Sequence, residues 1–173
     1  MIIGMSVGAF TALHVAISIV GIISGVVVLV AMLKSKAPAG WTALFLATTV
    51  LTSVTGFLFP ATGFTPAQAF GIFSLVLLAG ALFAFYAQHL AGTWRWVYVV
   101  AALAALYLNC FVLVVQSFEK VPFLHAFAPS QSELPFQLAQ LALLAIFIVT
   151  AVLAVRKFHP ERRPSVAFTA SPP

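Results

Sequence analysis

The side chains of this chain that can do chemistry are few, and most of them interrupt long apolar stretches. Eight polar residues recur near one end of successive stretches: His14, Ser18, Thr55, Ser74, Asn109, Gln116, Gln137 and Gln140. Polar groups in apolar surroundings are costly, and by default they mark a functional site or a specific contact. His14 is the strongest candidate, because an imidazole changes its charge near neutral pH and ligates metals. We expect the eight residues to line a ligand-binding cavity, since convergent polar groups in an apolar cavity are typical of such sites.

The composition of the chain suits lipid rather than water. Of its 173 residues, 63% are hydrophobic and only 6% are charged, which is far less charge than a soluble surface needs. A helix needs about 20 mostly apolar residues to cross a bilayer. Five stretches meet this length, at about 10–33, 41–59, 68–90, 94–117 and 135–155. The sequence therefore predicts an all-α integral membrane protein, with a single bundle of about five transmembrane helices over residues 1–158.

The depth of the polar side chains suggests that they belong together. An α-helix rises about 1.5 Å per residue, which places His14 roughly 6 Å below the outer end of its predicted helix. By the same count, each predicted helix contributes a polar side chain to the outer half of the bundle. A second interpretation stays open for His14: it hydrogen-bonds Gln116 or Gln140 and so holds its helix against a neighbour.

Several kinds of chemistry are disfavoured by the residues present. His14 lies near the outer end of its helix and His89 near the inner end, so this pair cannot hold one haem iron. No carboxylate interrupts the apolar stretches, which disfavours a proton pump or an ion-coupled transporter. Cys110 is the only cysteine and cannot form a disulfide within the chain. We find no metal-ligand spacing and no acid–base–nucleophile set, which favours a non-enzymatic protein but leaves an enzyme open.

The basic residues predict the orientation of the bundle. Seven of the eight follow the first predicted helix, begin the fourth or follow the fifth: Lys34, Lys36, Arg95, Arg156, Lys157, Arg162 and Arg163. With five helices these three places share one side, which the positive-inside rule assigns to the cytoplasm. The N-terminus is then outside and the C-terminus inside. Because the charge lies at helix ends rather than on a basic face with stacking aromatics, we expect anionic lipid and not nucleic acid as its partner.

The segment 118–134, between the last two predicted helices, is too apolar for a free loop. Phe123 and Phe127 are spaced for one face of a short helix, and Pro122 suits its first turn. We expect this helix to lie in the membrane interface as a lid, with Phe123, His125 and Phe127 near the polar cluster. A simpler interpretation, in which the aromatics only anchor the loop, stays open. For 159–173, which has four prolines and no apolar period, we expect a disordered cytoplasmic tail.

Three functions are compatible with this pattern. The first is a non-enzymatic bundle of a bacterial inner membrane that binds a quinone or a lipid in an outer-leaflet cavity. Such a protein suits an accessory subunit of a larger membrane complex, or a homo-oligomer. The second is a transporter or channel for a small neutral solute, and the third is a haem or redox membrane protein. The polar cluster around His14 favours the first of these.

Overall fold

The structure, a computed structural model of the whole chain, describes residues 1–160. The described part of the chain is all-α, and five of its helices are long and apolar enough to cross a membrane. The long helices are α1 (Val7–Leu33), α2 (Ala39–Gly56), α3 (Pro66–Leu82, continued by the π-helical turn η1, Phe83–Ala87), α4 (Trp94–Lys120) and α6 (Leu134–Lys157). A short sixth helix, α5 (Pro122–Phe127), lies between α4 and α6 in sequence. By helix length and hydropathy the chain is a polytopic membrane protein, and the prediction of five helices long and apolar enough to cross a membrane is confirmed.

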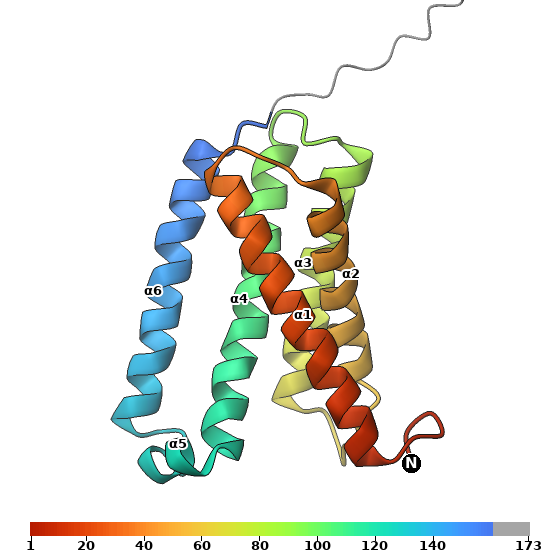
Figure 1. Cartoon of the computed structure of the whole chain (residues 1–173), viewed down its shortest axis with the longest axis vertical. Coiled ribbons are helices and arrows are strands. Elements are labelled where there is room, and N and C mark those ends of the chain that lie inside the picture. The colour runs from red at the N-terminus through yellow and green to blue at the C-terminus, as the bar shows by residue number, and fades with distance from the viewer. Residues whose placement is uncertain (161–173) are drawn as a thin grey trace, which may run out of the picture.

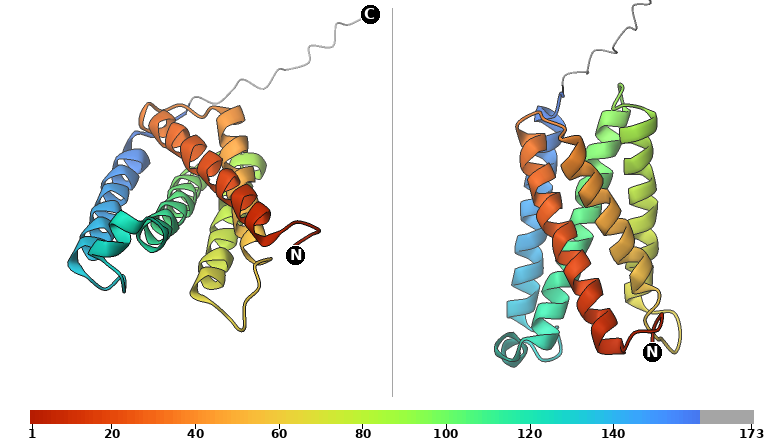
Figure 2. Two further views of the ribbon diagram at one scale, coloured as in Figure 1. Left: turned by 60° about the horizontal axis from the view of Figure 1, so that its bottom comes forward. Right: turned by 45° about the vertical axis from the view of Figure 1, so that its right-hand side comes forward.

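Helix α4 lies at the centre of the bundle. It packs against α1, α2, α3 and α6, while α1 and α2 form an antiparallel pair with an extensive contact of their own (Figure 1). Helix α1 crosses α4 obliquely, as the views in Figures 1 and 2 both show. At one end of the molecule α1 lies beside α6, and toward the other end it diverges from α4 and α6. The bundle therefore opens along its length.

The end at which α1 approaches α6 carries all the described basic residues except Lys120, and we call it the basic end. It contains the α1–α2 connection, the α3–α4 connection and the end of α6 (Figure 1). The Arg95 guanidinium donates to the Phe158 carbonyl over 2.9 Å, and the His159 backbone N–H donates to the Ser35 hydroxyl over 2.8 Å. The three basic segments thus share one end, as the charge pattern requires. The assignment of this end to the cytoplasm, with the N-terminus outside, stays a prediction.

The hydrophobic core lies in the basic half of the bundle. Its buried members come from all five long helices: Val28, Met32, Phe45, Leu46, Leu78, Ala81, Ala84, Tyr98, Val99, Ala101, Ala102, Leu103, Ala105, Leu106, Ala154 and Phe158. The opposite half, which we call the distal half, is packed less tightly. Helix α4 shows the change clearly, because most of its residues from Tyr98 to Leu108 are buried, whereas each of residues 109–117 is at least partly exposed.

Close helix packing in the basic half depends on Gly25. A methyl group placed on Gly25 would lie 2.6 Å from Leu106 Cδ1 and 2.8 Å from the Phe45 ring, distances that real side chains do not tolerate. Gly21, one turn away, faces Thr48 and Asn109 with slightly more room. Since lipid gives helices no hydrophobic reason to associate, close van der Waals packing at small residues holds such bundles together.

Several expected helix boundaries differ from the observed ones: α1 begins at Val7 rather than residue 10, α2 ends at Gly56 rather than residue 59, and α4 ends at Lys120 rather than residue 117. The third helix was expected to run to residue 90, but α3 ends at Leu82 and the π-helical turn η1 ends at Ala87. His89 and Leu90 then take left-handed backbone conformations, with φ of 48° and 58°, which turn the chain sharply into α4. Of the expected tail, His159 and Pro160 are described, and residues 161–173 lie outside the described part of the chain.

Candidate functional site

A seam of hydroxyl groups on α2 connects this helix to its three main neighbours. Thr42 lies 3.4 Å from the Tyr98 hydroxyl on α4, and Ser53 lies 3.2 Å from the Ser74 hydroxyl on α3. Two further contacts join α2 to its neighbours: Asn109 Nδ2 on α4 lies 3.5 Å from Thr49 Oγ1, and His14 Nδ1 on α1 lies 2.7 Å from Thr55 Oγ1. The Thr48 hydroxyl instead bonds a carbonyl of its own helix. Polar side chains buried in a membrane bundle are expected to bond across helices in this way. Helix α2 is therefore the polar centre of the bundle.

The seam does not form a continuous polar path. Phe45 and Leu46, both buried, separate Thr42 in the basic half from Thr49 in the middle of the bundle. Thr49 is itself fully buried between α1 and α4, where the Asn109 amide reaches it. On the distal side two polar pairs remain, Ser53 with Ser74 and His14 with Thr55.

The His14 ring is fixed by its contact with Thr55. The Thr55 hydroxyl has one proton, and it lies 2.7 Å from the Leu51 carbonyl of its own helix, to which it donates. Thr55 Oγ1 can then accept a hydrogen bond, and we infer that His14 Nδ1, 2.7 Å away, carries the proton and donates to it. In the neutral ring this tautomer leaves Nε2 with an unshared electron pair. No residue within 1–160 forms a hydrogen bond to Nε2.

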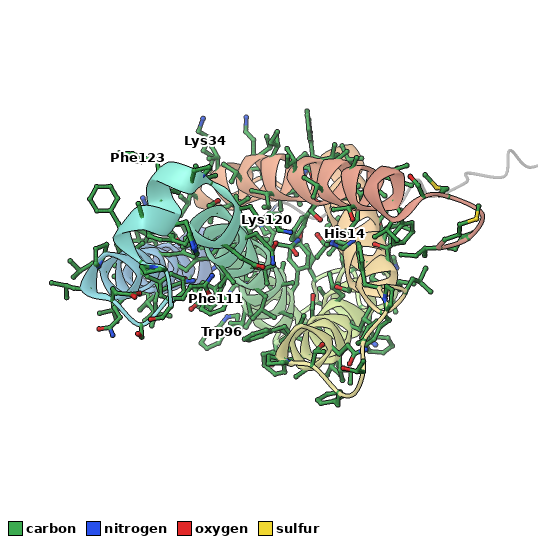
Figure 3. All side chains as sticks on the ribbon, turned by 90° about the horizontal axis from the view of Figure 1, so that it is seen from below. His14, Lys34, Trp96, Phe111, Lys120 and Phe123 are labelled. Carbon is green, nitrogen blue, oxygen red and sulfur yellow. The ribbon has the colours of Figure 1, made fainter. Side chains whose placement is uncertain are left out.

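Aromatic rings surround the half-buried imidazole. The edge of the Phe59 ring meets the His14 ring at a centroid distance of 5.3 Å, and Phe10 packs on Phe59 at 5.1 Å. A methyl group placed on Gly56 of α2 would lie 3.9 Å from His14 Cε1, which is ordinary van der Waals contact. Figure 3, which looks onto the distal end, shows His14 on the side of α1 that faces the other helices. The site thus combines one polar nitrogen with apolar walls.

The other predicted site residues have separate environments. Ser18 donates to the His14 carbonyl of its own helix, and Ser74 meets Ser53 in a buried contact. The Gln137 amide donates to the Ser132 carbonyl and is exposed, so it stabilises the turn before α6. The structure therefore joins His14 with Thr55, Asn109 with Thr49, and Ser74 with Ser53, but it does not bring the eight residues into one cluster.

Neither glutamine that was expected to bond His14 does so. Gln140 donates from Nε2 to the Phe111 carbonyl over 3.3 Å and so joins α6 to α4. Gln116 lies two turns beyond Asn109 on the same face of α4, is exposed, and has no hydrogen-bond partner within residues 1–160. The divergence of α1 from α4 explains both observations, because it removes His14 from the reach of α4 and α6.

Helix α5 forms as its sequence predicts, with Pro122 in its first turn. It packs against the distal end of α4, where His125 Nδ1 lies 3.3 Å from the Phe118 carbonyl. Phe123 and Phe127 stack on each other at 5.0 Å and are exposed, and Phe123 points outward in Figure 3. In this structure α5 lies to the side of α4 away from His14, so a lid role for Phe123, His125 and Phe127 stays a prediction.

Two features of the site could not be assigned from the sequence. The partner of His14 is Thr55, which depends on the rotation of α1 against α2, although the hydroxyl periodicity of α2 was a usable signal. A large cavity, about 1490 Å³ in volume, lies at the basic end and not beside His14. His89 lines this cavity, so the structure places His14 and His89 at opposite ends of the bundle.

Within residues 1–160, no cluster of three or more His, Cys, Asp or Glu side chains is arranged to hold a metal ion. No family model, curated protein or solved structure matches this chain.

Proposed function

We propose that this protein is a non-enzymatic bundle of a bacterial inner membrane that binds a hydrophobic ligand with a polar head group in its distal half. A quinone or a lipid meets this description. With the N-terminus outside and the C-terminus in the cytoplasm, the distal half lies in the outer leaflet. One observation carries the proposal: His14 Nδ1 contacts Thr55, whereas His14 Nε2 has no hydrogen-bond partner within the described residues.

The packing of the distal half supports an occupant. Residues 11–20 of α1 and 109–117 of α4 include no fully buried side chain, whereas the basic half has a continuous core. Two buried polar atoms, Thr52 Oγ1 and Gln140 Oε1, have no hydrogen-bond partner within residues 1–160. A buried polar group without a partner costs about 1–3 kcal/mol, and each such group needs an explanation. Both atoms have almost no accessible surface, so a ligand head group reaches them only when a neighbouring side chain moves.

The tautomer of His14 specifies the chemistry of the head group. A neutral imidazole with its proton on Nδ1 accepts a hydrogen bond at Nε2, so the ligand must donate one. A reduced quinone and a lipid with a free hydroxyl both donate, while their hydrocarbon chains suit the apolar walls formed by Phe10 and Phe59. We therefore expect a hydroxyl-bearing amphiphile as the ligand.

The test is to identify what the protein retains during purification. Mass spectrometry of the organic extract should find a hydroxyl-bearing amphiphile in amounts that approach the protein concentration. His14→Ala should lose it, and Thr55→Val should lose most of it, because valine keeps the shape of the side chain but releases the ring. Thr150→Val is the matched control, since the Thr150 hydroxyl bonds only to carbonyls of its own helix α6 and lies far from His14. Equal retention by His14→Ala and the control, with both proteins folded, would contradict the proposal.

A second candidate function, as a subunit of a larger membrane assembly, is favoured by Gln116. An exposed amide at membrane depth is unfavourable in lipid, and a polar contact with a neighbouring helix would satisfy it. Gln116→Leu should then reduce the assembled fraction in native gels while leaving the monomer folded. A monomeric wild-type protein in native membranes would exclude this candidate.

A further inference from the structure

The cavity at the basic end is formed by three segments that are far apart in the sequence. The α1–α2 connection contributes residues 34–37 and Ala39. The π-helical turn, the α3–α4 connection and the start of α4 contribute residues between Phe85 and Arg95, and His159 and Pro160 complete the lining. Its volume of about 1490 Å³ exceeds that of an ordinary small-molecule pocket, which is about 300–1,000 Å³. A smaller hollow of about 410 Å³ adjoins it and shares Gly92 and Arg95. The cavity therefore has room for a head group larger than a single ion.

The charges around this cavity are of one sign. Lys34, Lys36 and Arg95 line it, together with His89 and His159. The two carboxylates within residues 1–160, Glu119 and Glu133, both lie at the distal end of the bundle. No acidic side chain in the described part of the chain therefore neutralises the cations of the cavity. An anion is the complementary ligand.

The backbone that shapes the cavity is held in uncommon conformations. Ser35, His89 and Leu90 have φ between 48° and 58°, a left-handed region that costs non-glycine residues energy and often marks functional sites. The π-helical turn Phe83–Ala87 precedes two of them, and such turns are also frequent at functional sites. Two hydrogen bonds fix the frame, from Arg95 to the Phe158 carbonyl and from the His159 N–H to the Ser35 hydroxyl. The cationic groups are thus presented on a preorganised scaffold.

We propose that this basic-end cavity binds a phosphate group. Phosphate fits the guanidinium of Arg95, of which one nitrogen is used in the frame and the others can donate, while Lys34 and Lys36 act as flexible point charges. The phosphate belongs either to an anionic lipid head group or to a soluble phosphate compound. The apolar rings of Phe85 and Tyr86 in the cavity wall suit a molecule with an apolar portion. This site is separate from the one at His14 and does not depend on it.

The test uses the full-length protein in a neutral detergent, where no charged surface contributes. Native mass spectrometry would follow the binding of dioleoyl phosphatidylglycerol. Phosphatidylcholine is the control lipid, because its choline group cancels the charge of its phosphate. In a second arm, calorimetry would follow inorganic phosphate. Lys34→Gln/Lys36→Gln is the test variant, because neither lysine side chain has a hydrogen-bond partner within the described residues. Arg156→Gln/Lys157→Gln removes the same charge at the same end from residues that do not line the cavity.

The expected result is preferential binding of phosphatidylglycerol that the test variant weakens by about 25-fold, since each basic side chain contributes about fivefold. The control variant should change it by less than about threefold. Binding of inorganic phosphate with the same dependence on Lys34 and Lys36 would identify a soluble phosphate as the source and also support the site. Equal losses in the two variants, or no preference for either phosphate probe, would overturn the proposal and leave only diffuse attraction between the basic end and anionic lipid.

Discussion

His14 Nδ1 on α1 donates to Thr55 Oγ1 on α2 over 2.7 Å, and this contact sets the chemistry of the distal half. The Thr55 hydroxyl lies 2.7 Å from the Leu51 carbonyl, and when it donates its proton there, the ring donates at Nδ1. The second ring nitrogen is then an acceptor in an aromatic environment formed by Phe59 and Phe10. A hydrogen bond that holds two helices together also leaves a binding group free.

The close approach of α1 to its neighbours at Gly25 should be essential for stability. Gly25→Ala places a methyl group 2.6 Å from Leu106 Cδ1, so we expect a loss of about 1–3 kcal/mol from overpacking. Gly8→Ala is the matched control on the same helix, because no atom lies within 4 Å of its added methyl group. Thermal unfolding in detergent can be followed by thiol labelling of Cys110, the only cysteine. If the two variants melt at the same temperature, the α1–α4 contact is not as close as described.

The Asn109–Thr49 contact should couple α4 to α2. A double-mutant cycle with Asn109→Leu and Thr49→Val is expected to give a coupling energy of about 0.6 kcal/mol, the mean for hydrogen bonds between membrane helices. The distance of 3.5 Å between Nδ2 and Oγ1 argues against a larger value. Reversible unfolding in mixed micelles would measure all four proteins. Strictly additive changes would show that Asn109 bonds elsewhere.

The orientation of the chain in the membrane can be tested with reporter fusions. We predict that a reporter active only in the cytoplasm is active when it is fused after Lys157 and inactive when it is inserted at Ser130. The reason is the concentration of basic residues at one end of the bundle. The reverse pattern would place the distal half, and with it His14, in the cytoplasmic leaflet.

The sequence predicted the membrane spans well, because apolar length and basic flanks are local properties of the chain. It predicted the shared end of the basic segments for the same reason. It could not predict that Thr55, and not Gln116 or Gln140, contacts His14, since this depends on how α1 crosses α4. The early end of α3 was also missed, because His89 and Leu90, which take left-handed conformations, are not glycines and lie at the end of an apolar stretch.

The measurement that tests the central claim most directly is nitrogen NMR of the His14 ring. Histidine-labelled protein at about pH 8, where an ordinary imidazole is neutral, would give the ring signals, and His14→Gln would assign them by their loss. Short-chain ubiquinol and 1-oleoylglycerol would serve as hydroxyl-bearing probes. We predict a protonated Nδ1, an unprotonated Nε2, and a saturable shift of the Nε2 signal with at least one probe. A protonated Nε2 beside an unprotonated Nδ1, or an Nε2 signal that neither probe moves, would contradict a ligand site at His14.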